Sequence, residues 1–197
     1  MPERDEWVVL CAPDGSGAGS VLKATVHHRD TPLHLAFSCY VFDPAGRVLV
    51  TRRAHHKQTF PGVRTNSCCG HPAPGEGMQV AVRRRLKDEL GIAGSQLELE
   101  LILPAFRYQA TAADGTVENE LCPVYRAITT DTEVQVDPSE VDEAWWVPWA
   151  ELVTDVDETD PLSSWGTRQV EQLNALGPDP SAWPAGDLSL LPRAACP

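Results

Sequence analysis

Apolar and polar positions along the chain follow two periods, which together predict a sheet accompanied by a few helices. Strands are indicated where apolar residues alternate or cluster between turn-forming residues. They are expected over residues 8–10, 34–42, 48–51, 97–103, 105–110, 117–128 and 145–148. Helical spacing is found over residues 77–90, with Gly91 as the stop, over 149–153 and over 163–176. The pattern favours a mixed α+β fold, mostly strands with two longer helices packed beside them.

Turn-forming residues divide these elements and give the chain its expected organisation. Residues 43–46 are predicted to join the strands on either side into a hairpin, and residues 61–72 to form a loop. A chain of 197 residues is long enough for one sizeable domain. We therefore predict a single domain over residues 1–176, followed by a Pro-rich tail over 177–197.

Charge and composition exclude several classes of partner. The chain has 28 acidic against 16 basic residues, a net charge of −12, so its field repels nucleic acid and anionic membranes. A phosphate-bearing ligand would need a metal ion or a focused basic pocket. The sequence shows neither a basic, apolar leader nor a run approaching the ~18 apolar residues of a membrane span, so a cytoplasmic protein is expected. Its 6 cysteines form no C-x-x-C pair, which is typical of free thiols.

The helix expected over residues 77–90 places a carboxylate where an apolar residue would be usual. On a helical wheel Glu89 lies inside the apolar stripe, and Arg85 lies at its edge. The stripe consists of Met78, Val82, Leu86 and Leu90. A carboxylate in this position is costly unless it is paired or bound to a cation. An i, i+4 ion pair with Arg85 and a cation site both remain open.

Two acids and three histidines are candidates for a metal site. Glu118 and Glu120 are two residues apart in an expected strand, so their side chains point to the same face. Imidazole nitrogens from His27, His34 and His71 could join them, and such a mixture suits a divalent transition metal. Each histidine alone is more often structural, and a lone E-x-E could be a solvated strand face. The histidines left as surface residues are His28, His55 and His56.

A thiol and a cluster of cations complete the set of candidates. Cys69 would lie beside the metal, where a thiol ionises more easily, although Cys68 and Cys69 could equally be packing residues. Arg52, Arg53 and Lys57 could form a local basic patch for phosphate, although a charge run is often only a solvated face.

Residues 70–92 resemble the Nudix box, G-x5-E-x7-R-E-U-x-E-E-x-G-U with U apolar. Gly70, Glu76 and the run RRLKDELGI at 84–92 carry the resemblance. Arg85 replaces the first glutamate after the arginine of the box, and Asp88 replaces the next. Nudix hydrolases use these glutamates to hold metals, so ordinary pyrophosphate hydrolysis is not expected of this chain. A Nudix hydrolase of nucleoside diphosphate derivatives and a non-catalytic domain with a structural metal remain as alternatives.

Three further blocks resemble one branch of that superfamily, the type 1 isopentenyl-diphosphate isomerases. They are TPLHLAFS at 31–38, TNSCCGHP at 65–72 and VENELCPV at 117–124, within a similarity that runs from about residue 21 to 165. The resemblance implies a Nudix-like mixed sheet flanked by helices, with added N-terminal strands. It also implies an enzyme that interconverts isopentenyl and dimethylallyl diphosphate for isoprenoid biosynthesis, as a monomer or homodimer whose partner is this small diphosphate.

The same resemblance implies roles for individual residues. A Mn²⁺, Mg²⁺ or Zn²⁺ ion would be held by His27, His34, His71, Glu118 and Glu120. Cys69 and Glu120 would transfer protons with help from the Tyr108 hydroxyl. Glu89 would help to hold a Mg²⁺ that arrives with the diphosphate. The substrate would be bound by Lys23, Arg53, Lys57 and Arg85, with Trp165 at its hydrocarbon end.

Overall fold

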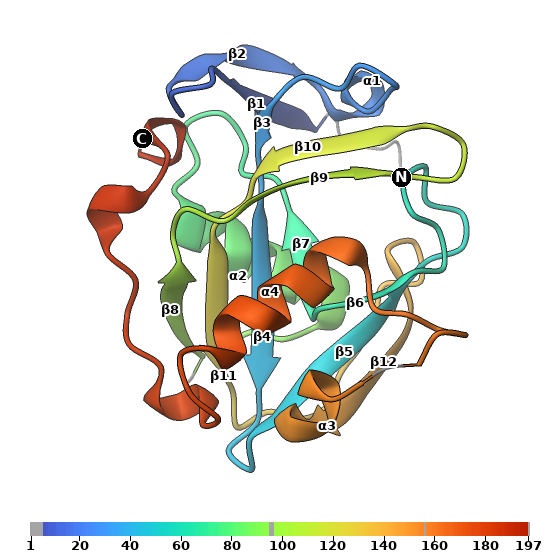
Figure 1. Ribbon diagram of the computed structural model, residues 1–197, viewed down its shortest axis with the longest axis vertical. Helices are drawn as coiled ribbons and strands as arrows, with labels where there is room; N and C mark the ends of the chain where they lie inside the picture. Colours follow the sequence, from blue (N-terminus) through green and yellow to red (C-terminus); the bar gives the residue numbers. More distant parts are fainter. Residues whose placement is uncertain (1–5, 95–96, 156, 197) are drawn as a thin grey trace.

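Two β-sheets, one above the other in Figure 1, form the framework of the computed structural model, which describes residues 6–94, 97–155 and 157–196. The upper sheet has the order β2 (Gly17–Leu22), β1 (Trp7–Cys11), β3 (His34–Leu35), β10 (Val117–Leu121) and β9 (Arg107–Thr111). The lower sheet has the order β12 (Val141–Pro148), β5 (Arg47–Arg53), β4 (Phe37–Phe42), β11 (Val124–Ile128) and β8 (Glu98–Leu103). Two short strands, β6 (Arg64–Thr65) and β7 (Cys68–Gly70), pair with β5 and β4.

Three helices confirm the predicted helical segments to within two residues at each end. They are α2 (Met78–Leu90), α3 (Trp149–Val153) and α4 (Ser164–Asn174), and a further short helix, α1 (Lys23–Val26), was not predicted. Helix α2 ends at Gly91, which adopts a left-handed φ of 70° that glycine accommodates without strain. Helix α4 is capped by the Ser163 hydroxyl, which accepts a hydrogen bond from the Gly166 backbone N–H.

The lower sheet is buried on both faces, and its central strand explains why. Along β4, Phe37, Cys39 and Val41 pack in one apolar cluster with α2, because alternate side chains point to the same face. Tyr40 and Phe42 point the other way, into a second cluster that also contains residues of α3 and α4. Figure 1 shows α2 behind this sheet and α4 in front of it. The fold is therefore a sheet between helices, as the α+β prediction expected.

Two segments predicted as single strands each divide between the two sheets. The chain leaves β3 for β4 at Ala36, and it leaves β10 for β11 at Cys122 and Pro123. Pro123 has no N–H to donate, so it interrupts the ladder of the predicted strand 117–128. The two breaks lie at the same level, because Ala36 donates its N–H to the Leu121 carbonyl at 2.9 Å. The sequence pattern missed this division since the apolar run continues across both breaks.

Other local predictions need correction. The predicted loop 61–72 contains β6 and β7, and β2 and α1 were not predicted because their residues have weak periodicity. The predicted hairpin is confirmed at its turn, but β4 and β5 share only the Phe42–Val48 pair before they diverge. β5 pairs mainly with β12 instead.

The C-terminal segment lies against the domain. Trp183 and Ala195 are buried in the two apolar clusters. The Arg126 guanidinium donates to the Pro180 carbonyl at 2.5 Å, which fixes the start of this segment. The domain boundary at residue 176 stays a prediction. Among the described residues, no helix is both long and apolar enough to cross a membrane.

Candidate active site

Strand register brings three of the predicted site residues into one row of the upper sheet. Glu120 lies opposite His34 across the parallel β3–β10 pair, and opposite Tyr108 across the antiparallel β9–β10 pair. Directly opposed residues share a face of a sheet, and so does Glu118, two residues along the same strand. The predicted common face of Glu118 and Glu120 is confirmed. Both acids are buried, with exposed fractions of 5% and 4%.

The three predicted histidines and Glu120 form one compact cluster. His27 directly follows α1, His34 begins β3, and His71 directly follows β7. A nitrogen from each ring and an oxygen of Glu120 all lie within 4.8 Å of one another. The ring centroids are 5.2–5.7 Å apart. Residues up to 93 positions apart in the sequence, His27 and Glu120, are therefore gathered in one place.

The hydrogen bonds of this cluster fit a bound cation. The Nδ1 of His34 lies 2.9 Å from the Pro32 carbonyl and must donate to it, because a carbonyl only accepts. In the neutral ring Nε2 then carries a lone pair, and it faces a Glu120 oxygen at 3.4 Å. His71 Nε2 faces the same oxygen at 3.3 Å. Two acceptors facing each other need a proton or a metal ion between them. The Nε2 atoms of His27 and His34 are buried without a hydrogen-bond partner among the described residues.

The pKa shifts keep most of these ligand atoms free of protons. Burial, with the neighbouring histidines, lowers the pKa of His27 to about 3, and burial lowers that of His71 to about 4. Burial would raise the pKa of Glu120, but His34 and His71 outweigh it and hold that pKa well below its usual range. Burial also disfavours charge on His34, yet Glu120 raises its pKa overall. Because a metal ion binds unprotonated imidazole and carboxylate, the set suits a divalent cation.

Glu118 and Tyr108 form a separate pair beside the cluster. The Tyr108 hydroxyl donates to a Glu118 oxygen at 2.8 Å, although Tyr108 stands opposite Glu120 in the ladder. Burial and the charge of Glu120 raise the pKa of Glu118. Burial and the charge of Glu118 raise the pKa of Tyr108 well above its usual value. The four-residue cluster does not include Glu118, so its role as a fifth metal ligand stays a prediction.

Cys69 lies under the same site, and its neighbours were not assigned roles from the sequence. Its thiol lies 3.1 Å from the Asn66 side-chain oxygen and 3.4 Å from the Ser38 hydroxyl. Gln169 of α4 donates to that hydroxyl at 2.9 Å. Burial raises the pKa of the Cys69 thiol to about 11, so the metal-free protein keeps it protonated at neutral pH. Cys68 packs in the core. Asn66 and Ser38 stand in the quoted motifs, whereas no sequence signal pointed to Gln169.

An aromatic wall closes one side of the site. Trp165 is fully buried and stacks on Tyr108, with ring centroids 5.5 Å apart and an interplanar angle of 28°. Phe60 meets Trp165 edge to face at 5.1 Å. Phe60 has a φ of 47°, a left-handed conformation that is uncommon for an aromatic residue. The Arg53 guanidinium donates to the carbonyls of Thr59 and Phe60, which stabilises this turn.

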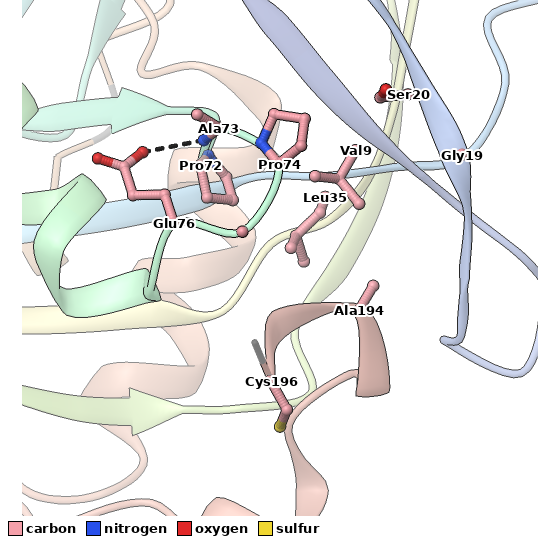
Figure 2. Close-up of a pocket in the computed structure, with 11 residues that line it drawn as sticks. Val9, Gly19, Ser20, Leu35, Pro72, Ala73, Pro74, Glu76, Ala194 and Cys196 are labelled. Atoms are coloured by element: carbon pink, nitrogen blue, oxygen red, sulfur yellow. Dashed lines mark hydrogen bonds between the residues drawn. The ribbon is translucent and has the colours of Figure 1, made fainter.

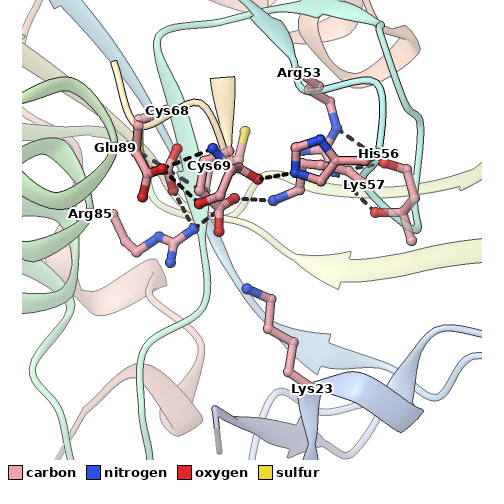
Figure 3. A network of polar contacts seen from close by, with 12 residues as sticks. Lys23, Arg53, His56, Lys57, Cys68, Cys69, Arg85 and Glu89 are labelled. Carbon is pink, nitrogen blue, oxygen red and sulfur yellow. Dashed lines mark hydrogen bonds and ion pairs between the residues drawn. The ribbon is translucent and has the colours of Figure 1, made fainter. Parts of the chain in front are cut away.

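The predicted diphosphate-binding cations are gathered close by, each with partners inside the protein. Figure 3 shows Arg53, Lys57 and Arg85 around one network, with Lys23 directed towards it from α1. Lys57 pairs with Glu140. Arg85 pairs with Glu89, as the helical wheel allowed, and both side chains are buried.

The remaining member of the predicted basic patch lies apart from this network. Arg52 is held by Asp160 at 2.8 Å and Glu143 at 3.2 Å, so its charge is compensated at the molecular surface. His28, His55 and His56 are exposed, as predicted.

The cavity at this network is small, about 20 Å³, and Arg53, Lys57, Cys69, Glu89 and Glu140 are among its lining residues. It has room for about one water molecule. A larger cavity of about 340 Å³ lies between β1, residues 72–76 and the C-terminal segment, and Figure 2 shows the residues that line it. That cavity is lined by none of the predicted site residues, so it is not where the candidate chemistry is gathered.

Comparison with known proteins identifies the family. The NUDIX domain family matches residues 32–166, more than half of the chain. A Mycolicibacterium vanbaalenii protein named isopentenyl-diphosphate Delta-isomerase is 54% identical over 181 residues, covering 90% of this chain and 97% of that one. The chain belongs to this isomerase family. A Saccharopolyspora erythraea isopentenyl-diphosphate Delta-isomerase is 50% identical over 191 residues, covering 96% of this chain and 97% of its own.

Solved structures support the fold of this isomerase family member at lower sequence similarity. DR0079 from Deinococcus radiodurans superposes with a TM-score of 0.66 at 17% identity, covering 85% of this chain and 98% of its own. A MutT protein from Methanosarcina mazei gives a TM-score of 0.59 at 18% identity, and the match covers 74% of this chain and 96% of that protein. The predicted Nudix-like arrangement of a mixed sheet and helices is thereby confirmed.

Proposed function

We propose that this chain interconverts isopentenyl and dimethylallyl diphosphate by adding a proton to one end of the double bond and removing another proton from the carbon next to the cationic centre that results. Relatives that it matches along nearly their whole length are named for this isomerisation. The observation that carries the assignment of the site is the position of the cluster of His27, His34, His71 and Glu120. Glu120 of this cluster stands opposite Tyr108 in the β9–β10 ladder, and its charge acts on the Cys69 thiol. Cys69 also lines the small cavity together with Arg53 and Lys57.

His27, His34, His71 and Glu120 would hold a divalent cation, with Glu118 as a fifth ligand. Their unpartnered nitrogens and low imidazole pKa values support this role. Such a cation would supply positive charge that holds the Glu120 carboxylate ionised and fixed in place. Glu89 would help to hold a Mg²⁺ that comes with the diphosphate, since its carboxylate lines the cavity beside the cations.

Cys69 and Glu120 are the groups that exchange protons with the substrate. An unactivated alkene gains a proton at one end and becomes a tertiary carbocation, which then loses a proton from the adjacent carbon. Two proton-transfer groups of the protein are needed, one on each side of the substrate. Each must lie within hydrogen-bond reach of the carbon that it protonates or deprotonates. The Tyr108 hydroxyl assists the carboxylate side, where it already donates to Glu118.

The remaining residues bind the two ends of the substrate. Lys23, Arg53, Lys57 and Arg85 hold the diphosphate, because guanidinium and ammonium groups are the strong donors to phosphate oxygens. Trp165 faces the hydrocarbon end, where its indole stabilises a cation without forming a bond to it. Its burial beside Phe60 and Tyr108 supports a water-free wall, and water would otherwise capture the carbocation.

Hydrogen exchange tests this proposal directly. The metal-loaded protein, incubated with isopentenyl diphosphate in heavy water, is expected to release dimethylallyl diphosphate that contains deuterium. Cys69→Ala and Glu120→Gln should each lose nearly all of this activity, whereas Cys196→Ala, at an exposed thiol, should keep it. Product without deuterium, or no product from the metal-loaded wild-type chain, would contradict the proposal. Phosphate release from a nucleotide panel would favour a Nudix hydrolase instead.

A further inference from the structure

One carboxylate near the cationic network has no role in the isomerisation proposed above. Glu6 directly precedes β1, and its two oxygens bind two different cations. One oxygen lies 2.5 Å from the Lys23 ammonium and the other lies 3.3 Å from the Arg85 guanidinium. A single anion thus bridges α1 and α2, with one oxygen for each cation. A phosphate group bound by these two side chains would make the same pair of contacts.

Arg85 does not depend on Glu6 for its charge compensation. Its Nη2 faces the carboxylates of Glu89 and Glu140, whereas its Nη1 faces Glu6. Those two acids are largely buried, with side-chain exposed fractions of 8% and 22%. Glu140 also pairs with Lys57, so both acids have ion pairs that do not involve Glu6. The Glu6 contact is therefore the outer one of the three.

Glu6 also differs from those acids in its exposure. Its side chain is 44% exposed, so water competes for both of its ion pairs. Ion pairs of this exposure contribute little to stability and exchange readily. A diphosphate carries more charge than one carboxylate, so it competes well for Lys23 and Arg85. While Glu6 stays there, its negative charge also opposes the approach of any anion.

We infer that Glu6 is a resident anion of the diphosphate site, which the substrate displaces when it binds. Glu6 thereby sets the affinity for the diphosphate group by competing for its two cations. This inference rests on the proposed function, because the diphosphate role of Lys23 and Arg85 is part of that proposal.

Binding of inorganic pyrophosphate with Mg²⁺ to the full chain, measured by titration calorimetry, tests the inference. Glu6→Gln keeps the shape of the side chain and removes its charge. Glu143→Gln is the matched control, because Glu143 is also exposed and pairs with a different arginine, Arg52, at 3.2 Å. We expect the pyrophosphate Kd to fall about two- to fivefold in Glu6→Gln, which corresponds to the modest worth of exposed ion pairs. It should stay near the wild-type value in Glu143→Gln.

The outcomes separate this inference from the proposed function. Unchanged or weaker pyrophosphate binding in Glu6→Gln overturns it, since Glu6 would then be absent from the competition or would position the cations. Equal tightening in Glu143→Gln also overturns it, because net charge alone would explain the effect. If Glu6→Gln alone binds tighter but the wild-type chain shows no deuterium exchange, the anion competition stands and the isomerase proposal fails.

Discussion

In the buried Arg85–Glu89 ion pair, replacing Arg85 should lower the stability of the fold far more than replacing Glu89. Within the described part of the chain, Arg85 is the one cation in ion-pair contact with Glu89. Arg85 itself contacts Glu89, Glu140 and Glu6. Arg85→Met therefore leaves a carboxylate buried without a partner. Glu89→Gln leaves the guanidinium with two carboxylates, so most of its compensation remains.

The structure allows an estimate of both costs. A buried charge that loses its partner costs about 3–5 kcal/mol, and the exposed fractions of both side chains, 8% each, place this pair in that class. We expect Arg85→Met to lower the free energy of unfolding by about that amount. For Glu89→Gln we expect about 1 kcal/mol, the net contribution of a typical intramolecular hydrogen bond, because no charge is left buried without a partner. The double variant should be close to Glu89→Gln, because it contains no unpaired buried carboxylate.

Urea denaturation in EDTA, followed by tryptophan fluorescence, measures these values for the metal-free chain. Burial raises the pKa of Glu89, and Arg85 opposes that rise. Without Arg85 the folded-state pKa lies further above the unfolded value, so folding takes up a proton. The cost of Arg85→Met should therefore shrink as the pH falls from 8 to 5. Equal costs for the two single variants, or a cost for Arg85→Met that does not change with pH, would refute this reasoning.

Three further predictions follow from burial, metal ligation and close packing. Burial raises the pKa of Glu140, but the two cations beside it outweigh this and lower it to about 2. The ionised Glu140 carboxylate therefore contributes about 3 kcal/mol at most to the free energy of unfolding. This contribution is complete above pH 4.5 and disappears towards pH 2, so the unfolding curves of wild type and Glu140→Gln should converge there. Mn²⁺ at about 100 times its Kd should add about 2.7 kcal/mol to the free energy of unfolding of the wild type and of the exposed-site variant His28→Ala. It should add little to His34→Ala, and a full gain in His34→Ala would argue against ligation. Gly70→Ala adds a Cβ 3.0 Å from side chains of α2 and β4, so it should cost about 1–3 kcal/mol in urea denaturation. Gly17→Ala is its control, because a Cβ added at Gly17 has no other atom within 4 Å. Equal costs for the two variants would contradict the packing argument.

Local patterns in the sequence determined the elements whose signals lie within a few residues. The apolar stripe of α2, its stop at Gly91 and the buried position of Glu89 all follow from a period of 3.6, and the structure confirms them. The common face of Glu118 and Glu120 follows from the period of two in a strand. The three histidines and Cys69 were candidates from the residues alone, and the family resemblance added one shared site and a role for each of them, although they are far apart in the sequence.

Tertiary structure decided how these separate pieces meet. Nothing in the local pattern showed that strands 34–42 and 117–128 both cross between the sheets, since sheet membership depends on long-range pairing. That crossing sets the register that faces His34 with Glu120. The tertiary structure also decided the hydrogen-bond partner of Tyr108. Its long side chain carries the hydroxyl to Glu118, although Tyr108 stands opposite Glu120 in the strand ladder. The sequence thus identified the candidate groups, and only the folded chain determined their distances, burial and charge partners.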